Sequence, residues 1–178
     1  MTIHIQQKLQ ELLNVPSLPC EDASDWAQGK TIQEIWNTCD RGDWLLWWVQ
    51  KRGLDSRKLT AAKAACAEFA RPYMKDARSI AALDMAHAYG RGECSSDDLA
   101  SAASAAYAAS AASAASAAYA ASAAYAAYAA SAASAAYAAS AASAAASASY
   151  ASAAKRSEIL QKCADEVRRI VTLQDLGY

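Results

Sequence analysis

Tryptophan and arginine are concentrated in one short stretch of this sequence. Four of the five tryptophans lie between residues 36 and 48, and Arg41 lies among them. Trp44, Trp47 and Trp48 have the i, i+3, i+4 spacing that places side chains on one face of a helix. A guanidinium over an indole ring makes a cation–π contact, and both residue types are frequent at interface hot spots. The candidate binding residues are Arg41, Trp44, Trp47, Trp48, Arg71 and Arg78.

Two interpretations of these tryptophans are open at this point. Large rings at helical spacing often fill a protein core, and in that case Trp36, Trp44, Trp47 and Trp48 stabilise the fold. The alternative is a groove that the rings line. Arg41 and Arg78 could then also donate hydrogen bonds to an anion, while the rings stack on a planar group.

Residue types that support catalysis or metal binding are sparse. The sequence has two histidines, His4 and His87, and neither lies in the strand–turn–helix context of a hydrolase nucleophile. Asp84 and His87 could share a helix face near Cys94, but a zinc site needs a second pair of ligands. The sequence also lacks the glycine-rich loops that bind phosphates. We therefore predict a protein that is not an enzyme and that needs no metal or other cofactor.

The overall composition argues against two classes of partner. The 17 basic and 18 acidic side chains give a formal charge of −1, which provides no electrostatic basis for non-specific nucleic-acid binding. Five separated cysteines without a C-x-x-C pair favour reduced and mostly buried thiols. The first residues lack the basic and apolar regions of a secretory signal, and the long alanine-rich segment lacks large aliphatic residues. We expect a cytoplasmic protein with no membrane and no nucleic-acid partner.

Hydrophobic spacing predicts an all-α fold, a compact bundle of about six to eight helices. A first amphipathic helix ends before Pro16, and a polar loop follows it. Thr31 and Glu34 form a capping box that begins the next helix, and Asp43 is placed to cap another that starts at Trp44. Later helices are expected over 56–70, over 76–89 with Gly90 and Gly92 as the stop signal, and from Ser95 onward.

A long low-complexity tract follows. From Ser101 to Ser143 the chain repeats a triplet, Ser or Tyr followed by two alanines, without Gly or Pro. Alanine has the highest helix propensity, so we predict helix here, broken at least once into closely packed antiparallel segments. Apolar residues recur at helical spacing between 159 and 171, so a C-terminal helix should dock on the core. We expect one domain over 1–178, with a Trp/Arg part (1–94), the alanine-rich part (95–154) and the C-terminal helix (155–178).

An ordered series of short motifs resembles one known family. The motifs are Trp36-Asn-Thr-Cys-Asp-Arg-Gly-Asp-Trp-Leu-Leu-Trp-Trp48, Cys66-Ala-Glu-Phe-Ala-Arg-Pro72, Asp76-Ala-Arg78, Ala81-Ala-Leu83 and Tyr89-Gly-Arg-Gly-Glu93, before a long Ala/Tyr tract. Over about residues 30 to 171 they resemble the immunity proteins of bacterial polymorphic toxin systems. Those proteins are all-α and are encoded beside toxins, and similar sequences occur in phage genomes. The resemblance implies a binding protein without naming its target.

Three functional hypotheses follow. The first is a cytoplasmic inhibitor that binds a toxin or a defence protein through the Trp/Arg surface. The second is a phage-type sponge that sequesters a small anionic, nucleotide-like signalling molecule with Arg41 and Arg78. The third is a structural helical scaffold, with assembly into a homo-oligomer as a further option. The sequence favours the inhibitor and leaves its target open.

Overall fold

The computed structural model describes residues 2–74, 77–112 and 153–178. In these residues the protein is all-α and has no strand, which confirms the predicted fold class. The described α-helices are α1 (Thr2–Leu13), α2 (Glu21–Trp26), α3 (Ile32–Thr38), α4 (Gly42–Lys51), α5 (Ser56–Glu68), α6 (Ala77–Arg91), α7 (Ser96–Ala112) and α10 (Ala153–Ile170). Two short 3-10 helices, η1 (Arg71–Tyr73) and η2 (Gln174–Leu176), follow α5 and α10.

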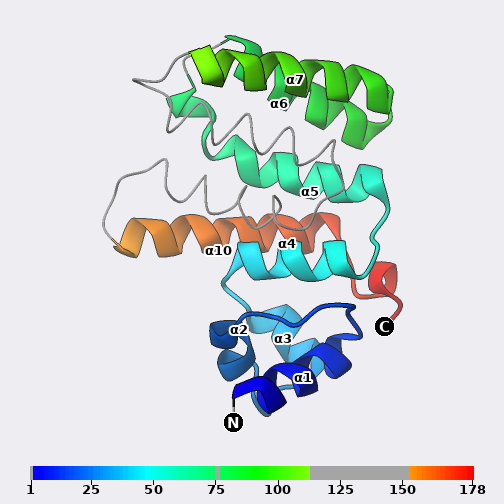
Figure 1. The fold of residues 1–178 in the computed structure, drawn as a ribbon, viewed down its shortest axis with the longest axis vertical. Coiled ribbons are helices and arrows are strands. Elements are labelled where there is room, and N and C mark those ends of the chain that lie inside the picture. The colour runs from blue at the N-terminus through cyan, green and yellow to red at the C-terminus, as the bar shows by residue number, and fades with distance from the viewer. Residues whose placement is uncertain (1, 75–76, 113–152) are drawn as a thin grey trace.

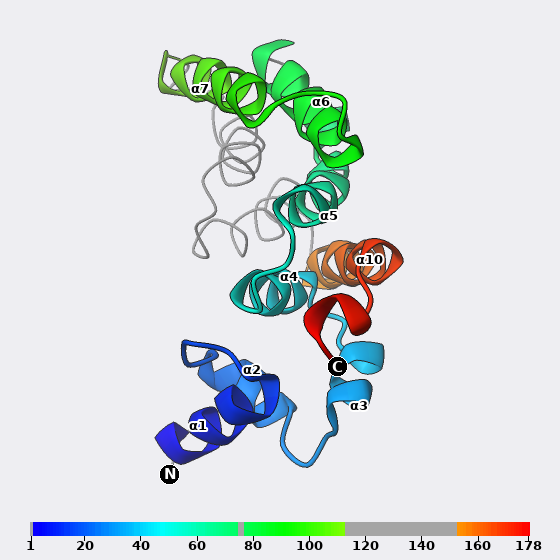
Figure 2. The same ribbon diagram turned by 90° about the vertical axis from the view of Figure 1, so that its right-hand side faces the viewer.

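The helices are stacked along the long axis of the molecule (Figures 1 and 2). From one end, α7, α6 and α5 follow one another as neighbours, and α4 and α10 lie side by side in the middle. Although α10 is distant in the sequence, it packs against both α4 and α5. Helices α1, α2 and α3 form the other end. The tryptophan-rich segment therefore lies where this end meets the middle of the stack.

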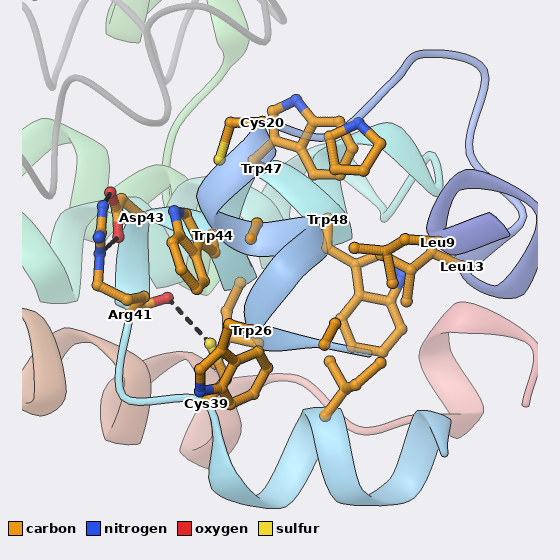
Figure 3. A pocket seen from close by; sticks show the side chains of 15 residues that line it. Leu9, Leu13, Cys20, Trp26, Cys39, Arg41, Asp43, Trp44, Trp47 and Trp48 are labelled. Carbon is orange, nitrogen blue, oxygen red and sulfur yellow. Dashed lines mark hydrogen bonds and ion pairs between the residues drawn. The ribbon is translucent and has the colours of Figure 1, made fainter. Parts of the chain in front are cut away.

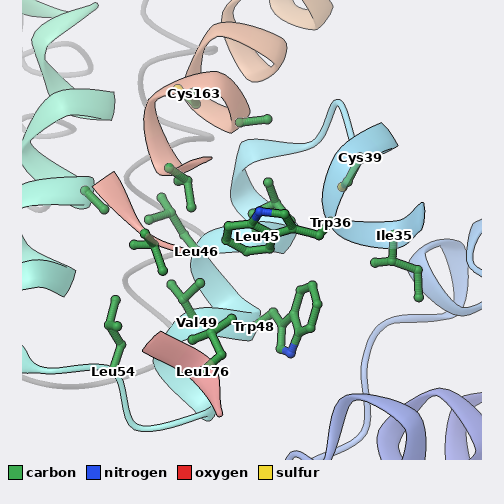
Figure 4. Packing of buried hydrophobic residues seen from close by; sticks show 14 of the residues in the cluster. Ile35, Trp36, Cys39, Leu45, Leu46, Trp48, Val49, Leu54, Cys163 and Leu176 are labelled. Carbon is green, nitrogen blue, oxygen red and sulfur yellow. The ribbon is translucent and has the colours of Figure 1, made fainter. Parts of the chain in front are cut away.

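The main core is centred on α4 and α10 (Figure 4). Leu46 and Val49 of α4 and Cys163 and Val167 of α10 have no exposed surface. The predicted docking of the C-terminal helix is thus confirmed, because its apolar stripe is buried as expected. A second cluster of buried residues joins α5, α6 and α7 around Leu83.

Local capping signals identify several helix starts correctly. The side-chain oxygen of Thr31 accepts from the backbone N–H of Glu34, and the Glu34 carboxylate accepts from the backbone N–H of Thr31, which confirms the capping box. Ser95 and Asp98 make the same reciprocal pair of bonds at the start of α7. These bonds use residues three positions apart, so they form wherever the local chain turns into a helix.

Two local predictions are wrong. The polar loop expected after α1 contains α2, whose first turn carries Glu21 and Asp22, acids that favour a helix N-terminus. Helix α4 begins at Gly42 instead of Trp44, so Asp43 lies inside its first turn and caps no amide. Asp43 instead binds a neighbouring guanidinium, as described below.

The stop signal after α6 is only half right. Gly92 has a φ of +82° and ends the helix in the left-handed conformation, as predicted. Gly90, however, lies within α6, where a Cβ would approach the Cβ of Ala61 on α5 to 2.8 Å. We infer that a glycine is needed at position 90 because α5 and α6 pack closely there, not because the helix ends.

The alanine-rich tract begins as a helix, as predicted. Residues up to Ala112 belong to α7, in which Leu99 and Ala103 are buried. The predicted break into antiparallel segments concerns residues 113–152, which lie outside the described residues. The described helices include no segment with the length and hydrophobicity of a membrane span.

Lys63 is buried in α5 with 1% of its surface exposed, and this burial lowers its pKa to about 8. In the unfolded chain a lysine has a pKa of about 10.4, so between pH 8 and 10 the unfolded state binds more protons than the folded state. We therefore expect the free energy of unfolding to rise by roughly 2–3 kcal/mol over this pH range. Urea unfolding of the wild type and of Lys63→Met at several pH values measures this; the rise should be absent in Lys63→Met. An identical pH profile in both proteins would contradict the assignment.

Candidate binding site

A pocket of about 280 Å³ lies between the α1–α2 pair and α4 (Figure 3). Its lining comes from α1 (Leu9, Leu13), α2 (Trp26) and the segment that precedes and includes α4. Four of the predicted binding residues contribute to it, namely Arg41, Trp44, Trp47 and Trp48. The exposed side chain of Cys20 and the half-buried rings of Trp44 and Trp47 indicate that the pocket opens to solvent.

One wall of the pocket is an ordered series of cations and rings. The Arg41 guanidinium lies 4.4 Å from the centroid of the Trp44 ring, and Trp44 contacts Trp26 at a centroid distance of 6.0 Å. Behind this wall, outside the pocket lining, Lys30 places its Nζ 4.1 Å from the centroid of the Trp26 ring. Each indole thus contacts a cation as well as a second ring, and such contacts hold the rings in fixed orientations.

The charge of Arg41 is neutralised within the site. Its Nε donates to one carboxylate oxygen of Asp43 at 2.8 Å and its Nη2 donates to the other at 2.5 Å. Asp43 is only 6% exposed, and the hydrogen bonds to it raise the pKa of Arg41 above its ordinary value. Because this bidentate pair has no net charge, the pocket as a whole is apolar and close to neutral.

The two tryptophans at the end of the predicted face differ in role. Trp48 is 2% exposed and contacts Trp36 edge to face at 5.5 Å and Tyr178 at 5.9 Å, so the core interpretation applies to it. Trp47 is half-buried and, within the described residues, is the one tryptophan without a ring contact. Trp47 packs against the main core, but its ring is only partly buried and lines the pocket, so the groove interpretation applies to it.

Cys39 forms part of the pocket floor beside Arg41. Burial raises the pKa of its thiol to about 11, so the group is neutral at physiological pH. Its S–H donates to the carbonyl oxygen of Arg41 at 3.6 Å. The thiol thus acts as a small apolar group, as predicted for most of the cysteines.

The α1 wall is fixed by two residues distant in the sequence, one after α4 and one after η2. The hydroxyl of Tyr178 donates to the carbonyl oxygen of Leu13 at 2.5 Å, and Nη1 of Arg52 donates to that of Asn14 at 2.9 Å. Arg52 also donates to the carbonyl oxygen of Leu176 at the end of η2. These bonds attach the end of α1 to α4, and so they determine the position of one side of the pocket.

Arg71 and Arg78 do not line this pocket, although they were predicted together with the tryptophans. Arg71 begins η1 and donates to the carboxylates of Glu68 and Asp84. Arg78 lies exposed in the first turn of α6. They are separated from Arg41 because Arg71 follows α5 and Arg78 lies at the start of α6, and these helices lie at other levels of the stack than α4 (Figure 1).

His87 belongs to the same charged group as Arg71. Its Nε2 lies 3.0 Å from a carboxylate oxygen of Glu68, which Arg71 also contacts. No group of three or more metal-binding side chains occurs in the part of the chain that the structure describes. These charge pairs can link the end of α5 to α6. Asp84 pairs with Arg71 and His87 with Glu68, so both side chains take part in contacts within the protein.

Trp26 and Asp43 are site residues that the sequence interpretation missed. Trp26 lies in a segment predicted to be loop, and the carboxylate of Asp43 was assigned to a helix cap. A signal was present for Asp43, because Arg41 lies two positions before it and opposite charges so close can pair. Trp26 carried no positional signal, since only the folding of α2 against α4 brings it to Trp44.

Comparisons of the chain with protein-family models, with curated proteins and with solved structures gave no match.

Proposed function

We propose that this protein is a cytoplasmic binding protein, and specifically an immunity-type inhibitor of a toxin or defence protein. The pocket of about 280 Å³ between α1, α2 and α4 is the observation that carries this proposal. In it a partner can bury a side chain against Trp26, Trp44 and Trp47. Tryptophan and arginine are the residue types that contribute most binding energy in protein interfaces when they surround such a desolvated pocket.

The charges around the pocket favour a protein partner over a small anionic signal. A sponge for a nucleotide-like anion needs several converging donors, but Arg41 is paired with Asp43 and Arg78 lies outside the pocket lining. The pocket is also at the lower limit of the ~300–1,000 Å³ found for ligand sites, a size that suits one side chain better than a nucleotide. An apolar, neutral pocket suits an uncharged side chain that protrudes from a folded partner.

Native mass spectrometry of the protein isolated from its own host cells tests this function. We expect a second protein to be retained at fixed stoichiometry by the wild type, and to be lost from Trp47→Ala because truncating a hot-spot residue weakens binding roughly 30-fold. Trp47 is half-buried, so circular dichroism should show that Trp47→Ala keeps its helical content.

Ile3→Ala is the matched control, because Ile3 is 64% exposed and lies outside the pocket lining. It should retain the partner as the wild type does. A partner retained equally by Trp47→Ala would contradict the proposed role of the pocket. Added mass of a few hundred daltons per chain, in place of a protein, would support the anion sponge instead.

A further inference from the structure

We propose that the pocket selects an uncharged aromatic side chain of the partner, with Trp47 as the stacking surface and Asp43 as the residue that excludes carboxylates. The inference rests on the proposed function, since it takes the pocket as the place where the partner inserts a side chain. The proposed function leaves the type of this side chain open, and the lining of the pocket narrows it to an uncharged aromatic group.

The ring of Trp47 is half-buried, packs against the core on one side and lines the pocket. The other four tryptophans each contact a second ring of the protein, whereas Trp47 contacts none within the described residues. An aromatic ring that packs on Trp47 gains more binding free energy than an aliphatic side chain that buries the same area. The part of the Trp47 ring that lines the pocket therefore favours Phe, Tyr or Trp over Leu or Ile in the occupant.

The volume of the pocket supports one ring and its attached backbone. An apolar cavity of about 150 Å³ is sufficient to bind benzene. The present pocket has about 280 Å³, so a phenyl or phenol ring fits with room for the atoms that connect it to a peptide. A second ring or an extended ligand would project into solvent.

The Arg41–Asp43 pair determines which charge the occupant can carry. Asp43 engages Nε and Nη2 of Arg41, while Nη1 of Arg41 makes no hydrogen bond within the described residues. The remaining N–H groups can donate to a backbone carbonyl beside the inserted ring. Because the buried Asp43 carboxylate cancels the charge of Arg41, a carboxylate in that position gains no net attraction and loses its hydration.

Three small probes test this selectivity on the full chain: N-acetylphenylalaninamide, N-acetylleucinamide and the carboxylate N-acetylphenylalanine. Chemical shifts of the five indole N–H groups of the ¹⁵N-labelled protein report binding. The signal of the Trp47 indole is assigned as the one that is missing from the spectrum of Trp47→Leu. For the wild type we expect a Kd on the order of 1 mM for the phenylalaninamide derivative. The leucinamide and the carboxylate should each bind about fivefold more weakly.

Two variants separate the two parts of the inference. Trp47→Leu keeps an apolar wall but removes the ring, so it should bind the two amides equally. Asp43→Asn keeps a similar shape and restores the net positive charge of Arg41, so it should reverse the preference and bind the carboxylate about fivefold more tightly than the phenylalaninamide. If Asp43→Asn does not fold, the comparison of probes in the wild type still decides the question.

Equal binding of the two amides by the wild type, tighter wild-type binding of the carboxylate, or no binding of any probe would overturn the inference. Failure of the selectivity proposal can be distinguished from failure of the proposed inhibitor function. Selective probe binding together with a partner that Trp47→Ala retains would overturn the inhibitor role of the pocket only. Loss of the partner from Trp47→Ala together with unselective probes would overturn only the choice of an uncharged aromatic group.

Discussion

Gly42→Ala should lower the free energy of unfolding by about 3 kcal/mol, at the upper end of the range for overpacked core positions. A Cβ at position 42 would lie 2.4 Å from the Cβ of Cys163 and 2.7 Å from the backbone nitrogen of Ala164. Both neighbours belong to α10, so relief requires α4 and α10 to move apart along the main core. Urea unfolding measures the effect.

Gly53→Ala provides the control for this prediction. Gly53 has a φ of +73°, and a Cβ there would have no neighbour within 4 Å. Its replacement should therefore cost only the strain of a left-handed backbone, about 1 kcal/mol. If Gly42→Ala proved no more destabilising than Gly53→Ala, the close approach of α4 and α10 at this position would be wrong.

Arg168→Ala should be comparably destabilising, by about 3 kcal/mol. Nε of Arg168 donates to the carbonyl oxygen of Trp36 at 2.6 Å, and Nη2 donates to the carbonyl oxygen of Cys39. Helices leave their last four carbonyls without partners inside the helix, so this arginine of α10 provides the missing donors for the end of α3. Removing it leaves two poorly solvated acceptors unsatisfied, and each such loss costs about 1–3 kcal/mol.

Arg169→Ala is the matched control, because Arg169 is adjacent on the same helix but 65% exposed. It pairs with Glu166 on the surface, and exposed pairs of this kind contribute less than about 1 kcal/mol. Thermal unfolding of both variants, followed by circular dichroism at 222 nm, compares them directly. Similar melting temperatures for the two variants would show that α3 does not depend on Arg168.

The same contact connects stability to the pocket. Arg168 fixes the chain from Trp36 to Cys39, and Arg41 follows two residues later. We therefore expect Arg168→Ala to disturb the Arg41–Trp44 contact as well as the core. In the folded variant, altered indole N–H shifts of Trp44 would report this change before global unfolding.

Much of the fold could be predicted from the sequence because helix signals are local. The capping box of Thr31 and Glu34 depends on residues three positions apart, and the stripe around Val167 depends on a period of about 3.6. The loop before α3 was misjudged because α2 is short and polar. Gly90 was misjudged because a glycine that ends a helix and one that allows close packing look identical in a sequence.

The candidate site was predictable only in part. The spacing of Trp44, Trp47 and Trp48 placed all three on one face, yet Trp48 is core and Trp47 lines the pocket. Which part of a helix face meets the core and which meets a cavity depends on the neighbouring helices. Arg71 was expected beside the tryptophans, but separation along a sequence does not predict distance in the fold, and Arg71 lies outside the pocket.

Local signals in the sequence were sufficient to predict that the chain is helical, where most described helices begin and end, and which residue types are available for binding. Packing of separate helices was needed to bring Trp26 to Trp44, to place Asp43 on Arg41 and to bring Arg168 to the end of α3. The two kinds of interaction differ in range. Helix propensity and capping act within one or two turns, whereas a pocket forms from side chains that come together when separate helices pack.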